Sequence, residues 1–74
     1  MNERKNKLNE LLLENMNNAI KEAGLSKSTI ARKLGVNYST IWRMLKGQRK
    51  IKPEYIAEIA NMTFRTPNDF FYRQ

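Results

Sequence analysis

The side chains of this chain that are best equipped for specific polar contacts lie between positions 37 and 47, in the stretch NYSTIWRMLKG. Arg43 and Lys46 are positively charged hydrogen-bond donors, and Trp42 offers a large aromatic face. Histidine and cysteine are absent from all 74 residues, so the usual metal ligands and nucleophile-base pairs cannot be assembled. We therefore expect recognition of a charged partner, with no catalytic residue, no metal site and no cofactor.

The charge is distributed unevenly along the chain. The formal net charge is +7, yet residues 1–22 carry four bases and four acids. Residues 23–53, called here the acid-free window, contain eight bases and no acid: Lys27, Arg32, Lys33, Arg43, Lys46, Arg49, Lys50 and Lys52. Solvated helices usually mix both signs, so this window predicts contact with a polyanion.

Length and composition favour one small helical domain. A chain of 74 residues can build a single core, so we expect one domain over residues 1–74. The start, MNERKNKLNE, has no apolar segment, and the longest aliphatic run is LLL at 11–13. These features predict neither a signal peptide nor a membrane span, and so a cytoplasmic protein.

The spacing of apolar residues predicts an amphipathic first helix that ends near Gly24. Its apolar stripe comprises Leu8, Leu12, Met16, Ala19, Ile20 and Ala23. Ser26 is a suitable N-cap for a second, short helix that ends at Gly35. No segment alternates with the period of a strand, so we expect an all-α fold.

Three more helices are predicted after Gly35. Asn37 can cap a third helix, which runs to Lys46. Pro53 suits the first position of a fourth helix. The sequence TPND, at residues 66–69, can open a short fifth helix that carries three aromatic residues.

Residues 27–46 satisfy the packing requirements of two short helices that cross closely at a turn. The crossing needs a small residue and the turn needs a glycine, which Ala31 and Gly35 provide. The apolar contacts come from Ile30, Leu34, Val36, Ile41 and Met44. This pattern resembles the helix-turn-helix of the Cro and CI type (phage lambda repressor-like, XRE) family of DNA-binding proteins, and the resemblance extends from Leu12 to about Phe71.

The resemblance implies a compact five-helix lambda-repressor-like domain whose recognition helix, residues 38–46, enters the major groove of DNA. The base-reading positions of the family correspond to Tyr38, Ser39, Trp42 and Arg43. The positions that contact the DNA backbone correspond to Lys27, Asn37, Lys46, Arg49 and Lys50. An arginine such as Arg43 can donate two hydrogen bonds to guanine O6 and N7.

Two segments depart from the family pattern. Many relatives pair an arginine late in the first helix with a glutamate near the end of the recognition helix, where this chain has Ile20 and Leu45. We expect these two aliphatic side chains to touch in place of the ion pair. The segment NMTFRT lacks the usual aliphatic-glycine-aliphatic sequence, so Met62 or Phe64 must fill that part of the core.

The resemblance also predicts a homodimer, at least on DNA, bound to a two-fold symmetric operator. Phe70 is expected in the core, and Phe71 or Tyr72 can pack across the two-fold axis, unless all three complete the core. The expected function is that of a Cro-like phage or mobile-element repressor in a bacterial cell. The alternative is an antitoxin that binds a toxin and its own promoter. Neither a membrane nor a small-molecule ligand is expected as a partner.

Overall fold

The computed structural model describes residues 3–72 of the chain and the side chains of residues 9–72. Within this range the elements are α1 (Glu3–Glu22), α2 (Lys27–Leu34), α3 (Tyr38–Leu45), α4 (Pro53–Met62) and the 3-10 helix η1 (Pro67–Phe71). No strand occurs among the described residues, so the all-α prediction is confirmed. The fifth helix is present, but it is a 3-10 helix.

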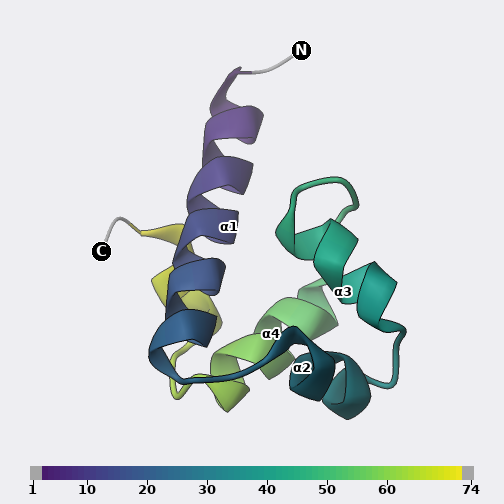
Figure 1. Cartoon of the computed structure of the whole chain (residues 1–74). Helices are drawn as coiled ribbons and strands as arrows, with labels where there is room; N and C mark the ends of the chain where they lie inside the picture. Colours follow the sequence, from purple (N-terminus) through teal and green to yellow (C-terminus); the bar gives the residue numbers. More distant parts are fainter. Residues whose placement is uncertain (1–2, 73–74) are drawn as a thin grey trace.

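Figure 1 shows how the short elements gather beside the long helix α1. The helices α2 and α3 are joined by a tight turn and pack against each other, while η1 packs against α1. The helix α4 contacts α1, α2 and η1. This arrangement leaves one side of α3 without a covering element.

The ends of α2 follow the capping signals in the sequence. The Ser26 hydroxyl accepts a hydrogen bond from the backbone N–H of Thr29 at 3.1 Å. Gly35 ends the helix with a φ of 70°, a conformation that an L side chain adopts only with strain. The tight turn between α2 and α3 therefore depends on a glycine at position 35.

Asn37 occupies the N-cap position of α3, as predicted, but its side chain makes no capping hydrogen bond. Pro53 is the first residue of α4, where a missing N–H costs nothing. At η1 the Asp69 carboxylate accepts a hydrogen bond from the Thr66 backbone N–H at 3.0 Å. Pro53 at the start of α4 and the Thr66–Asp69 pair at the start of η1 therefore occupy the positions expected from the sequence.

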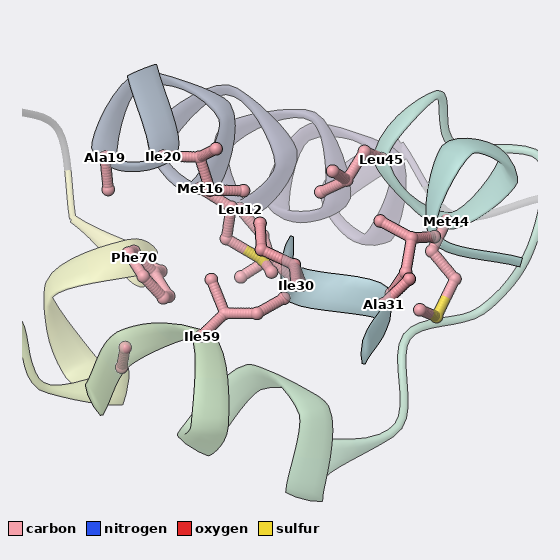
Figure 2. Close-up of a cluster of buried hydrophobic side chains, with 12 residues drawn as sticks. Leu12, Met16, Ala19, Ile20, Ile30, Ala31, Met44, Leu45, Ile59 and Phe70 are labelled. Carbon is pink, nitrogen blue, oxygen red and sulfur yellow. The ribbon is translucent and has the colours of Figure 1, made fainter. Parts of the chain in front are cut away.

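The core contains buried apolar side chains from every element (Figure 2). They are Leu12, Met16, Ala19, Ile20, Ile30, Ala31, Ile41, Met44, Leu45, Ile59, Ala60 and Phe70. Burying one large side chain of this kind stabilises the fold by about 1.5–3 kcal/mol. The seven positions predicted to form the helix-turn-helix packing all contribute, since Leu34 and Val36 pack against this core at its edge and Gly35 forms the turn. Ala23 is exposed, contrary to expectation, because α1 ends at Glu22, and the side chain of Leu8 lies outside the described residues.

Phe64 follows Thr63, the C-cap of α4, and adopts a left-handed conformation with a φ of 61°; its side chain is 95% exposed. Its N–H donates to the carbonyl of Asn61, and the Arg65 N–H donates to the carbonyl of Ala60 at 2.8 Å. This is the Schellman arrangement, in which the left-handed position is usually glycine. Of the two candidates for the core, Met62 packs against it and Phe64 does not.

The segment after α4 is tied to the end of α1 by an ion pair between Arg65 and Glu22. The pair lies at the surface and contributes little stability, so η1 is kept beside α1 mainly by direct packing. None of the helices in residues 3–72 has the length and apolar content needed to cross a lipid bilayer.

Candidate nucleic-acid interface

The outer face of α3 carries the four side chains predicted to read bases. Tyr38 and Ser39 open the helix, and Trp42 and Arg43 follow one turn later, so the helical period places all four on one side. All four are exposed, Tyr38 by 51% and Trp42 by 38%. The opposite face consists of buried residues: Ile41, Met44 and Leu45. The structure therefore brings the four predicted residues together on one surface, and Trp42 is not a core residue.

A cation-π contact extends this surface to the end of the helix. The Lys46 ammonium nitrogen lies 5.4 Å from the centroid of the Trp42 ring. This is within the range in which a cation is attracted by an aromatic face. The contact places a positive charge beside the aromatic surface at this end of α3.

The eight cations of the acid-free window lie on α2, on α3 and in the loop that follows α3. Seven of their side chains are exposed and Lys27 is half-buried. Among the side chains that the structure describes, the ion pair found joins Glu22 and Arg65, and neither residue belongs to the acid-free window. No carboxylate of the described part of the chain therefore neutralises these cations, and their field extends into solvent.

The predicted backbone-contact residues frame the outer face of α3. Asn37 precedes the helix and Lys46 follows it, while Lys27 is the first residue of α2. The Asn37 side chain is exposed and its amide oxygen makes no capping bond, and its NH2 group can donate to a phosphate oxygen. Arg49 and Lys50 are exposed in the loop after α3.

The C-terminal aromatic residues divide between core and surface. Phe70 is buried, whereas Phe71 is 40% exposed and Tyr72 is 67% exposed. The possibility that all three complete the core is therefore excluded. Two large apolar side chains remain on the surface at the end of η1, where the sequence predicted a dimer contact.

Asn15 fixes this C-terminal segment, a role that was not predicted from the sequence. The side chain is buried on α1, and its amide donates to the carbonyls of Phe70 at 2.8 Å and Tyr72 at 2.7 Å. Asn15 stands three residues after Leu12 on the apolar stripe of α1. A polar residue on an otherwise apolar stripe needs a buried partner, and that pattern was the available signal.

A second asparagine, Asn17, links α1 to the recognition helix. Its amide donates to the carbonyl of Leu13 at 2.9 Å and to the carbonyl of Leu45 at 3.2 Å. The Leu45 carbonyl lies in the last turn of α3, and a carbonyl in this position has no hydrogen-bond partner within its own helix. A hydrogen bond from a side chain of α1 to the main chain thus ties the end of α3 to the core.

The expected contact between Ile20 and Leu45 is not supported. Both residues are buried in the same core, as predicted. Figure 2, however, shows their side chains apart along α1, with Met16 and Leu12 between them. The polar link between these two helices is the hydrogen bond from the Asn17 amide to the Leu45 carbonyl.

No group of three histidine, cysteine, aspartate or glutamate side chains that could hold a metal ion occurs in the described part of the chain. The surface built around α3 carries cations, aromatic faces and amide or hydroxyl groups. Such a set suits phosphates and base edges, since arginine and lysine bind phosphates and aromatic or amide groups contact bases.

Comparison with known proteins supports this interpretation. Residues 17–70 match the model of the helix-turn-helix family (HTH_3), which includes proteins of the XRE, Cro and CI type. The matched segment contains the whole of α2, α3 and α4 and most of η1. No curated protein and no solved structure matches the chain. Because the family model covers well over half of the sequence, the chain belongs to the XRE, Cro and CI type of helix-turn-helix proteins, a family of DNA-binding transcription regulators.

Proposed function

We propose that this protein is a sequence-specific regulator that binds double-stranded DNA as a homodimer, in the manner of a Cro-like phage or mobile-element repressor. The recognition helix, expected over residues 38–46 and ending one residue earlier in the structure, with Lys46 as its C-cap, lies in the major groove, and the operator is two-fold symmetric. The observation that carries the proposal is the exposed outer face of α3, with Tyr38, Ser39, Trp42 and Arg43 on one side of a helix inside the acid-free window.

The four outer residues have different roles in this proposal. Arg43 donates two hydrogen bonds to guanine O6 and N7, which discriminates against other bases by about 1–3 kcal/mol. Ser39 is small and can donate or accept, so it specifies a base weakly. Tyr38 and Trp42 place apolar surface against thymine methyl groups and direct their polar atoms to phosphates or base edges.

The backbone set gives affinity and orientation without sequence information. In the proposal Lys27, Asn37, Lys46, Arg49 and Lys50 contact phosphates on both sides of the recognition helix. Their positions before, at the end of and after α3 support this assignment. Each lysine or arginine that neutralises a phosphate releases counterions, so binding weakens steeply with salt.

Dimerisation is assigned to the exposed aromatic residues Phe71 and Tyr72. A helix of eight residues covers only a few base pairs, so two copies are needed for a site of useful specificity. Asn15 supports this role because it holds the main chain at Phe70 and Tyr72 against α1. The two recognition helices of such a dimer read half-sites about 34 Å apart.

Selection of bound sequences from random duplex DNA tests the proposal. The purified protein is expected to enrich a palindromic sequence, and the mass of the complex is expected to correspond to two chains on one duplex. Enrichment by the protein alone supports a plain regulator over an antitoxin, which co-purifies with a small toxin. One chain per operator by mass would remove the two-fold arrangement, and no enrichment would remove sequence-specific binding.

A further inference from the structure

An open groove lies beside the recognition helix, between α1 and the loop that follows α3. Its volume is about 900 Å³, and its lining extends from Asn9 on α1 to Phe71 on η1. The volume is comparable to that of many ligand-binding clefts and leaves room for several side chains. None of the four predicted base-reading residues lines this groove.

The floor of the groove is apolar. Leu13 on α1, Ile51 in the loop and Ile56 on α4 line it, together with Phe71 on η1, which is also the proposed dimer contact, and none of these four side chains is fully buried. Four different elements thus expose apolar surface to one hollow. An exposed apolar surface gathered in a concave site is typical of a binding surface for apolar side chains.

The rim of the groove is positively charged. Lys46, Arg49 and Lys50 lie on the loop side, and Glu10 on α1 is the carboxylate residue among the lining residues. All three cations are exposed and have no carboxylate partner within the described residues. Their charge therefore favours an occupant that brings acidic groups to the rim.

Three kinds of occupant can be compared on this basis. A phosphate backbone would satisfy the rim and leave the apolar floor exposed to water. A second copy of this chain contacts the η1 end of the groove in the proposed dimer, through Phe71 and Tyr72, but its own residues 23–53 contain no acid and would bring the same cations toward the rim. An amphipathic segment with apolar residues on one face and carboxylates on the other matches both the floor and the rim.

We infer that this groove binds an acidic amphipathic segment of a partner protein, and that this segment competes with DNA for Lys46, Arg49 and Lys50. The competition rests on the proposed function, in which these three residues contact phosphates, but binding of the segment does not. A partner of this kind would release the protein from DNA by engaging these three cations, since none of the four base-reading residues lines the groove. The coupling is reciprocal, so bound DNA weakens binding of the segment by the same factor.

The test uses a synthetic helical peptide labelled with fluorescein, about 14 residues long, with leucine and phenylalanine at i, i+3, i+4 and i+7 spacing and glutamate elsewhere. Fluorescence anisotropy measures its affinity for the full chain in the absence of DNA. A peptide of the same composition in scrambled order is the control, and it is expected to bind at least about tenfold more weakly because it has no apolar face.

Two variants locate the binding site. Leu13→Gln alters the floor and Arg49→Glu alters the rim. Each substitution is expected to weaken the affinity for the patterned peptide by about tenfold or more. Arg32→Glu makes the same charge change on α2, away from the groove, and is expected to change the affinity by less than about threefold. Circular dichroism confirms that each variant keeps its helix content.

The outcomes separate the groove from the proposed function. Equal binding of the scrambled peptide, or unchanged binding by Leu13→Gln and Arg49→Glu, overturns the groove assignment. A patterned peptide that binds but does not displace duplex DNA overturns the competition alone. If the protein binds no DNA at all, the proposed function fails while the peptide titration still decides whether the groove is a docking site.

Discussion

The Lys46 ammonium lies over the Trp42 ring, 5.4 Å from its centroid, at the exposed end of the recognition helix. The two residues are one helical turn apart, so the contact aligns the lysine chain with the outer face of α3. This face presents both groups that a DNA groove accommodates, a flat apolar surface and a positive charge at its edge. A cation held in this place is available to a phosphate beside the major groove.

Lys46→Ala is expected to weaken binding to specific and non-specific duplexes alike, because a phosphate contact carries no sequence information. The slope of log affinity against log salt is expected to fall by about one. Lys33→Ala, which removes an exposed cation of α2 with no assigned contact, is the matched control and should leave the slope nearly unchanged. Equal effects of both variants would contradict the specific role of Lys46.

Arg43→Ala is expected to flatten the base preference at one position of each half-site, with a loss of about 1–3 kcal/mol on the preferred sequence. Arg43→Lys keeps the charge but loses the planar pair of donors, so it should retain non-specific affinity and still lose the preference. Affinities are measured on the selected operator and on a set of single-base variants. An equal loss on all sequences would remove Arg43 from the base-reading set.

Asn15→Ala is expected to lower the free energy of unfolding by about 1–3 kcal/mol, since the carbonyls of Phe70 and Tyr72 lose their donor. Urea denaturation measures this change. Asn18 is exposed and lies three residues further along α1, so Asn18→Ala is the control. Its free energy of unfolding should stay within about 0.5 kcal/mol of that of the native protein. If the two variants are equally stable, the Asn15 amide does not hold the C-terminal segment.

Phe64→Gly is expected to stabilise the protein by up to about 1 kcal/mol. The substitution relieves a left-handed conformation and sacrifices little packing, because the side chain is 95% exposed. Gly35→Ala is the matched opposite case: the position has a φ of 70° and open space for a Cβ, so a loss of stability there comes from the backbone alone. The two midpoints of urea denaturation should therefore move in opposite directions, and a lower midpoint for Phe64→Gly would show that this aromatic makes a stabilising contact.

The helix-turn-helix was predictable because its constraints are local. A small residue at the crossing, a glycine in the turn and aliphatic residues at fixed spacing leave few alternatives, so Ala31, Gly35 and Ile41 were assigned correctly. The exposure of Trp42 followed from the same period, because Ile41 and Met44 must face the core. Periodicity alone thus separated the two faces of α3.

Features that depend on contacts between distant residues were missed. The hydrogen bonds from Asn15 to η1 and from Asn17 to α3 cross 55 and 28 residues of sequence, and apolar spacing contains no information about them. The same limit explains the prediction for Ile20 and Leu45, in which two buried aliphatic residues were expected to meet. Phe64 was a candidate core residue by its type, but its backbone conformation after α4 directs the side chain into solvent.

Methylation interference on the selected operator tests the central claim, that α3 reads the major groove, most directly. Dimethyl sulfate modifies guanine at N7 in the major groove and adenine at N3 in the minor groove. The proposal predicts that N7 methylation of at least one guanine in each half-site blocks binding of the native protein, and that Arg43→Ala no longer responds to methylation at that guanine. Interference confined to adenine N3, or an Arg43→Ala variant with the same guanine sensitivity as the native protein, would contradict it.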